Sequence, residues 1–335
     1  MTAGSLFLAG ALATRVIRQR RRIGIGGSVA LITGGSRGLG LLIAAELGRL
    51  GSRIVLVARD RAELERARET LRAGQIDVSF VVADLGVRGE AARVLAGVIA
   101  AHGRLDILVN NAGVMKVGPL DHMAREDFEE AMAVHLWGPL EAMRAAIPQM
   151  RRQGGGRIVN ISSVGGKIGV PHLVPYCASK FALTGVSIAA GAELAGDGIV
   201  VTTVCPGLMR TGSPFNARFK GRNREEFAWF AIAGSLPLLS IDGRRAAAAI
   251  VEAMRCGDAE LVITWPARLA VAAAALVPNA LALAMHATNR MLPRAVEGGG
   301  TESHSGWQSG STWAPSLLTR LSERAASENN EVPPT

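Results

Sequence analysis

The chain contains a single tyrosine, Tyr176, and one of its four lysines, Lys180, follows four residues later. Residues four apart lie on one face of a helix, so we expect the phenol and the ammonium group side by side. A free phenol ionises near about pH 10, and a nearby ammonium group lowers this pKa toward the working range. The spacing therefore predicts a proton-transfer pair with Tyr176 as general acid or base.

Ser163 follows a predicted strand over 156–162. Side chains at the carboxyl ends of strands in an open α/β sheet meet ligands. We expect Ser163 to hydrogen-bond a substrate oxygen.

A glycine-rich turn, Thr-Gly-Gly-Ser-Arg-Gly-Leu-Gly over 33–40, links a predicted strand at 29–33 to an apolar helix. Glycines at such a turn let the backbone approach a pyrophosphate, whose charge lies against the helix N-terminus. A second strand follows at the expected distance, so the turn stands in the context that its function requires. We interpret it as a nucleotide-binding turn.

The end of the second strand indicates which nucleotide is bound. An acid usually stands there and accepts hydrogen bonds from the ribose 2′-hydroxyl, but this chain has Arg59. Asp60 comes too late, and with Glu63 it predicts a helix capping box. Arg37 and Arg59 together suit a 2′-phosphate, which predicts NADP(H) rather than NAD(H). The alternative is that one arginine is merely solvated.

The elements that position these residues form one repeating series. Near-continuous apolar strands alternate with helix-length segments, which is typical of a doubly wound (Rossmann) parallel sheet covered by helices on both faces. We predict seven strands and one catalytic domain over 28–265. The predicted strands are 29–33, 53–58, 77–83, 105–110, 156–162, 199–204 and 260–264.

Three further segments flank the predicted domain. Residues 1–27 combine an apolar stretch at 2–14 with five arginines, which predicts a short membrane anchor, a true span or a frayed helix. Residues 266–296 predict two short apolar helices that contact a membrane, cover a pocket or close an oligomer interface. Residues 297–335 are polar, and we expect them to be partly disordered.

Composition limits the possible partners and the compartment. The net charge is +9, and the arginines of the first 22 residues supply +5 of it, so the rest of the chain is only mildly basic. Aromatic residues make up 4% and do not alternate with arginines, which argues against nucleic-acid binding. The three cysteines are too few and scattered for a disulfide framework or a metal site. They favour a cytoplasmic catalytic domain, membrane-associated through its apolar ends.

These motifs together resemble the compact form of the short-chain dehydrogenase/reductase family over 28–265. The resemblance rests on Thr33-Gly34 with Gly38 and Gly40, Asp84-Leu85, Asn110-Asn111-Ala112-Gly113, Ser163, Tyr176, Lys180, and Pro206-Gly207 with Thr211. It implies hydride transfer between a nicotinamide and a carbonyl or alcohol. Tyr176 would protonate the substrate oxygen, Lys180 would lower the tyrosine pKa and bind the nicotinamide ribose, and Ser163 would position the carbonyl.

The resemblance also implies a cofactor-binding set. Asp84 would lie beside adenine, Asn111 and Gly113 beside the adenine ribose, and Pro206, Gly207 and Thr211 beside the nicotinamide. Without the family, Asp84 is equally a cap and Pro206-Gly207 a turn. The full predicted set is Thr33, Gly34, Ser36, Arg37, Gly38, Leu39, Gly40, Arg59, Asp84, Leu85, Asn111, Ala112, Gly113, Tyr176, Lys180, Pro206, Gly207 and Thr211.

One position departs from the family pattern. His135 stands where relatives usually carry an asparagine that helps to hold a water in the proton relay behind the lysine. A neutral imidazole can also donate and accept a hydrogen bond, so His135 is a candidate relay member with a different pH response. The alternative is a histidine satisfied by the helix backbone.

The substrate is the least determined feature. The segment after Thr211 predicts a substrate lid, and its aromatic residues either line the pocket or pack among themselves. If they line it, a bulky apolar steroid-, retinoid- or fatty-type carbonyl or alcohol fits. The alternatives are a β-ketoacyl-type reductase and a nucleotide-binding regulator without turnover. The resemblance also implies a homodimer or tetramer through helices that include 125–150 and 174–195. The lid aromatics are Phe215, Phe219, Phe227, Trp229 and Phe230.

Overall fold

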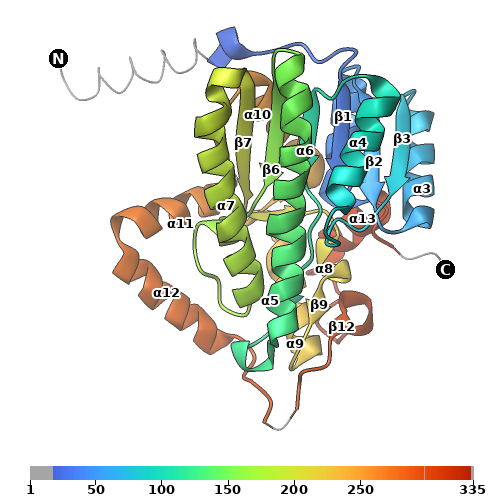
Figure 1. Ribbon diagram of the computed structural model, residues 1–335. Helices are drawn as coiled ribbons and strands as arrows, with labels where there is room; N and C mark the ends of the chain where they lie inside the picture. Colours follow the sequence, from blue (N-terminus) through green and yellow to red (C-terminus); the bar gives the residue numbers. More distant parts are fainter. Residues whose placement is uncertain (1–17, 298, 333–335) are drawn as a thin grey trace.

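The computed structural model describes residues 18–297 and 299–332. Its centre is a seven-stranded sheet in which every neighbouring pair is parallel (Figure 1). All seven predicted strands are confirmed, and the doubly wound fold with them. In spatial order the strands are β11 (Glu260–Ile263), β7 (Ile199–Pro206), β6 (Gly156–Ile161), β4 (Ile107–Asn110), β1 (Val29–Thr33), β2 (Arg53–Ala58) and β3 (Val78–Val82).

Helices cover both faces of this sheet, because its strands carry apolar side chains on both sides. In β1, Ala30 and Ile32 join one core cluster and Val29 and Leu31 join the other. The first face carries α2 (Gly38–Arg49), α3 (Arg61–Ala73) and α10 (Gly243–Cys256). The second, facing the viewer in Figure 1, carries α4 (Glu90–His102), α6 (Gly138–Arg152) and α7 (Val174–Leu194).

Short helical segments connect or extend these layers. A π-helical turn, η2 (Ala133–Trp137), joins α5 (Arg125–Met132) to α6. The 3₁₀ turns are η1 (Leu120–His122), η3 (Val164–Gly166), η4 (Ala195–Asp197) and η5 (Gly306–Gln308).

The predicted lid, the segment after Thr211, packs with neighbouring segments into a small unit. It contains α8 (Ser213–Asn216), α9 (Asn223–Ser235) and the short strands β5 (Lys116–Val117), β8 (Leu208–Arg210), β9 (Arg218–Phe219), β10 (Ser240–Asp242) and β12 (His304–Ser305). Its four phenylalanines are buried and form a core cluster. Of the two alternatives for the lid aromatics, packing among themselves holds for these four.

Residues 265–291 form a helical hairpin that projects from the body (Figure 1). Its helices are α11 (Trp265–Leu276) and α12 (Pro278–Met291), and Pro278 at the start of α12 separates them. Leu276 is 79% exposed and Leu283 69%. Within the described ranges, no helix combines the length and apolar character needed to cross a membrane.

The segment after Glu297 is packed rather than partly disordered over its described residues. It includes β12, η5 and α13 (Arg320–Glu328), which packs on α8 and α9. Ser322 is fully buried and pairs with Ser235 at 2.6 Å between the hydroxyl oxygens. Small polar side chains are buried here because each finds a hydrogen-bonding partner.

The predicted anchor at 2–14 lies outside the described residues. Four of the arginines that follow it are described, and two of these pair with carboxylates of the body. Arg18 pairs with Asp258 at 2.9 Å and Arg22 with Glu252 at 2.8 Å. These two side chains already have partners within the chain.

Candidate active site

Strand order places the predicted site residues along one edge of the sheet. The chain runs outward in opposite directions from β1 and β4, so their connections diverge and leave a crevice at the carboxyl ends. The glycine-rich turn follows β1, Asn111 follows β4, and Ser163 comes two residues after β6. The structure therefore brings the turn and the catalytic candidates to the same edge.

Tyr176 and Lys180 lie side by side on α7, as their spacing predicts. Lys180 Nζ is 5.7 Å from the centre of the tyrosine ring. Its ammonium group donates a hydrogen bond of 2.8 Å to the carbonyl oxygen of Ile161, the last residue of β6. This bond ties the catalytic helix to the strand end that precedes Ser163.

Ser163 caps the η3 turn beside the tyrosine. Its Oγ accepts a 3.0 Å hydrogen bond from the Gly165 backbone N–H. A Cβ at Gly165 would lie 3.3 Å from Cε1 of Tyr176 and 3.5 Å from Ser163 Oγ, so the glycine leaves the space between the serine and the tyrosine free.

Burial dominates the ionisation of the pair. It raises the pKa of Tyr176 to about 12, and a hydrogen bond from Ser163 opposes this shift only in part. Burial also lowers the pKa of Lys180 to about 7. In the chain alone the pKa of Tyr176 is therefore raised rather than lowered toward neutrality, chiefly by desolvation of the phenolate, and Lys180 bonds to Ile161.

Both ring nitrogens of His135 have partners within the chain. Nε2 accepts a 3.1 Å hydrogen bond from the Val114 N–H, so the proton is on Nδ1, which donates to Ser179 Oγ at 2.8 Å. Ser179 in turn donates to the carbonyl oxygen of Tyr176. Burial, with a smaller effect of Lys180, holds the histidine pKa well below its usual range. His135 is thus neutral and connects the segment after β4 to α7.

Thr33 and Asn111 link the ends of β1 and β4 at the crevice. Thr33 Oγ1 accepts from the backbone N–H groups of Asn111 and Ala112 at 2.9 and 3.0 Å. The Asn111 amide donates to the carbonyl oxygens of Thr33 and Gly34. These bonds fix the ends of β1 and β4 relative to each other.

The turn has the shape of a phosphate cradle. A Cβ at Gly34 would lie 2.8 Å from the Ala112 Cα, and one at Gly40 would collide with the Gly34 carbonyl oxygen, so close packing within the chain requires both glycines. Gly38, at φ +54°, differs, because its added Cβ would meet only the side chain of Glu331. Its open face at the start of α2 fits a dinucleotide pyrophosphate.

Arg37 and Arg59, the predicted 2′-phosphate residues, each lie near a carboxylate. Arg37 donates to Glu63 Oε1 at 2.8 Å, and Arg59 lies 3.8 Å from Asp84. Asp60 caps α3 as predicted, but the Glu63 side chain bonds to Ser36 and Arg37 rather than back to the cap. Glu63 therefore contacts the predicted site residues Ser36 and Arg37, which its interpretation as part of a capping box did not predict.

The remaining predicted cofactor-binding residues make the following contacts within the chain. Asp84 accepts from the Gly86 N–H at 2.9 Å within a turn, and α4 begins only at Glu90 with Gly89 before it, so Asp84 does not cap that helix. Leu39 and Leu85 are buried in opposite core clusters. The Gly207 N–H donates to Ile263, and the carbonyl oxygen of Thr211 accepts from Asn329. Gly113 lies against His135, and Pro206 ends β7.

Three residues beyond α13 reach this site without having been predicted. Asn329, Asn330 and Glu331 contact the glycine turn, α3 and α8. Nothing in their local sequence indicates a binding site, because their position depends on how α13 packs.

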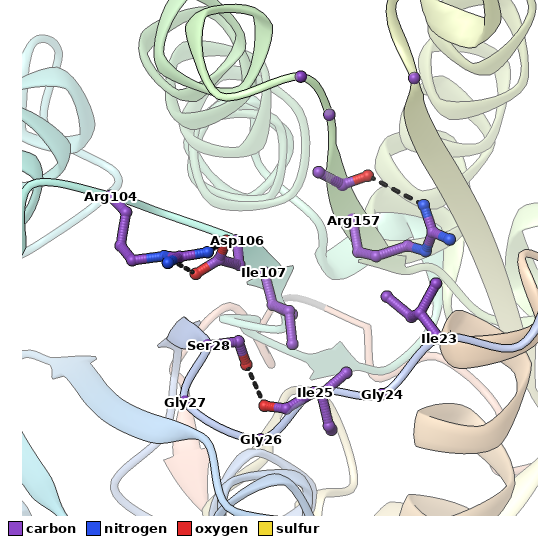
Figure 2. Close-up of a pocket in the computed structure, with 14 residues that line it drawn as sticks. Ile23, Gly24, Ile25, Gly26, Gly27, Ser28, Arg104, Asp106, Ile107 and Arg157 are labelled. Atoms are coloured by element: carbon purple, nitrogen blue, oxygen red, sulfur yellow. Dashed lines mark hydrogen bonds and ion pairs between the residues drawn. The ribbon is translucent and has the colours of Figure 1, made fainter.

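A separate pocket of about 440 Å³ lies at the opposite edge of the sheet (Figure 2). Ser28, Ile107 and Arg157 line it, and they stand at the amino ends of β1, β4 and β6. Arg104 and Asp106 form an ion pair at its rim. Ligands of doubly wound sheets bind at the carboxyl ends, so this pocket is distinct from the candidate active site.

Comparison with known proteins agrees with this geometry. A family model described as short chain dehydrogenase matches residues 28–218. The chain belongs to this family. The matched residues include the glycine turn, Ser163, Tyr176 and Lys180, which are the residues that converge at the crevice.

Individual short-chain dehydrogenases match most of the chain. Ketoacyl reductase 1 of the granaticin polyketide synthase from Streptomyces violaceoruber is 36% identical over 70% of this chain and 88% of its own. An actinorhodin polyketide ketoreductase solved with NADPH shares 31% identity at a TM-score of 0.63, over 71% of this chain and 96% of that one.

L-Sorbose reductase from Gluconobacter frateurii, solved with NADPH and L-sorbose, covers 72% of this chain and 97% of its own, with 26% identity and a TM-score of 0.65. Together with the family match, these relatives establish that this protein is an NAD(P)-dependent oxidoreductase.

Proposed function

We propose that this protein interconverts a carbonyl and an alcohol with NADP(H). The observation that carries the proposal is the convergence of Ser163, Tyr176 and Lys180 on the crevice that the glycine turn borders. When bound, the cofactor supplies or accepts the hydride. The chain supplies the proton, the orientation of the substrate oxygen and a water-poor surrounding.

Each catalytic side chain has one task in the reductive direction. The Ser163 hydroxyl donates a hydrogen bond to the carbonyl oxygen and orients it. Tyr176, protonated at neutral pH because its pKa is about 12, donates its proton to that oxygen as negative charge develops. Lys180 stabilises the phenolate that remains. His135 acts as a positioning residue, since its two hydrogen bonds hold α7 and the segment after β4 together.

The surroundings of the tyrosine support an apolar substrate. Met115, Val170 and Tyr176 pack at the margin of the lid cluster, and Leu173 and Cys177 belong to it. A bulky apolar ketone, aldehyde or alcohol of lipid, steroid or retinoid type fits such walls better than a sugar. The ketoacyl reductase relatives favour a second candidate, a β-ketoacyl thioester.

Turnover with the two nicotinamide cofactors tests the proposal. NADPH and NADH consumption should be measured on a panel of apolar ketones, aldehydes and a β-ketoacyl thioester. Because guanidinium groups bind a 2′-phosphate strongly, we expect kcat/KM with NADPH to exceed that with NADH by at least about tenfold. Replacing both Arg37→Ala and Arg59→Ala should remove most of this preference.

Arg61→Ala provides the matched control, since Arg61 is an exposed arginine that pairs within α3 with Glu65. It should leave the cofactor preference as it is. A preference that survives the double substitution contradicts the assigned phosphate site, and no turnover with any carbonyl contradicts the proposed reaction.

We also propose that the hairpin α11–α12 contacts a membrane surface. Residues 269–289 carry no charge, and the only buried residue of either helix is Ala267 at the base of α11. Trp265 and Arg268 stand at that base and Arg290 at the end of α12, where an aromatic ring and cations suit lipid headgroups. A helix of 12 residues is about 18 Å long, which reaches into one leaflet.

We also propose that the chain assembles as a homodimer or tetramer. Trp137 on η2 and Phe181 and Ile188 on α7 are 55%, 46% and 51% exposed, so the two long helices present an apolar face. This face supports association between copies of the chain. The free, buried cysteines among the described residues suit the proposed cytoplasmic location.

A further inference from the structure

The chain crosses its own glycine turn just beyond α13. The carbonyl oxygen of Asn329 accepts a 2.9 Å hydrogen bond from the Gly38 N–H, and the Asn330 amide donates to the carbonyl oxygen of Ser36 at 2.8 Å. A Gly38 N–H that points into the crevice is a donor that a dinucleotide phosphate would use. Here a backbone carbonyl takes it.

Glu331 brings a carboxylate to the same place. It is 5% exposed and lies against the open face of Gly38. Arg37 Nε is 3.5 Å from one carboxylate oxygen, and the Asn216 amide donates to the same oxygen at 2.5 Å. A carboxyl group beside an arginine and a helix N-terminus lies where a phosphate would bind.

We propose that residues 329–331, here called the strap, are an autoinhibitory element that occupies the phosphate cradle and must leave it before NADP(H) binds. The inference rests on the proposed function, since it concerns access to that same site. The strap and a dinucleotide compete for the Gly38 N–H, for the space above Gly38 and for Arg37.

The anchoring of α13 lets the strap move without unfolding the body. Ser322 bonds to Ser235 of α9, and Ala326 packs against Gly212, so α13 is held independently of the cradle. The strap itself is held mainly by hydrogen bonds of the two asparagines and Glu331. Asn330 has φ +58°, a left-handed conformation that asparagine tolerates, so the chain turns sharply there. The strap is therefore the part that can open.

Binding of NADPH, followed by its fluorescence, tests the strap without any requirement for turnover. The chain that ends at Glu328 should bind NADPH with a Kd lower by about tenfold or more. Without the strap, the form with an open cradle is no longer a minor population. Glu331→Ala in the full chain should lower the Kd by about threefold. Glu328→Gln is the matched control, because this neighbouring carboxylate pairs with Arg244 and Arg324 outside the cradle. It should leave the Kd unchanged.

Hydrogen exchange of the full chain shows where the strap goes. Addition of NADPH should increase amide exchange over 329–331. Increased protection of this segment, or an equal or higher Kd in both altered chains, overturns the strap while the cofactor proposal stands. Failure of every variant to bind any dinucleotide overturns both proposals.

Discussion

At the residue scale, burial keeps both members of the catalytic pair close to their neutral forms. The pKa of Tyr176 is raised to about 12 and that of Lys180 is lowered to about 7, in each case chiefly by desolvation. A protonated phenol is the form that carbonyl reduction needs, since it must donate a proton. At neutral pH, the chain alone therefore holds Tyr176 in the protonated form that carbonyl reduction requires.

Glu331 is the residue through which pH should act on cofactor binding. Burial raises its pKa from 4.5 to about 7, with Arg37 and Asn216 opposing this and Glu63 adding to it. A pKa raised in the closed strap means that protonation favours closure. This stabilisation is complete below the released pKa of 4.5 and is lost as pH rises through about 7.

We therefore expect the NADPH Kd of the full chain to fall by up to about tenfold between pH 6 and pH 8. Glu331→Gln, which stays neutral, should lack this component. Titration with NADH separates out ionisation of the 2′-phosphate, which NADH lacks. Identical pH dependence of the wild type and the glutamine variant would contradict this role for Glu331.

At the element scale, the inner strands were predictable because they are buried on both faces and read as continuous apolar runs. The turn and the Tyr176–Lys180 spacing were predictable for a similar reason, since their chemistry is encoded locally. The positions of Glu63 and Glu331 were not. Each depends on how separate elements pack, and neither carries a local signal that distinguishes it from an ordinary solvated acid.

The hairpin α11–α12 should bind vesicles through its apolar surface. Leu276→Glu combined with Leu283→Glu should weaken co-sedimentation with anionic vesicles by at least about tenfold, since each buried leucine contributes about 1.5–3 kcal/mol. Leu317→Glu is the matched control, because Leu317 is 87% exposed and outside the hairpin. It should bind as the wild type does.

Light scattering on the same variants separates membrane contact from assembly. If the face of η2 and α7 forms the oligomer, the hairpin variant keeps the mass of a dimer or tetramer of the 35.0 kDa chain. A fall to the monomer mass would assign the hairpin to the interface between copies. Unchanged vesicle binding would contradict the membrane proposal.

At the scale of the whole molecule, two elements added to the dehydrogenase domain lie near its active edge. The strap lies across the cofactor cradle, and the segment that carries it packs on the lid, where Trp307 stacks on Phe215 at 4.6 Å between ring centres. The lid and the segment that carries the strap thus form one packed unit, from which the strap itself opens.

The most direct test of the proposed reaction follows the hydride itself. The protein is mixed with NADPH deuterated at the transferable position of the nicotinamide and with an apolar ketone, and the alcohol is analysed by mass spectrometry. We predict one deuterium per product molecule, and a rate lower by about 10²–10⁴ for Tyr176→Phe. Bound NADPH with no label in any product, or an unchanged rate in the phenylalanine variant, would contradict Tyr176-dependent carbonyl reduction.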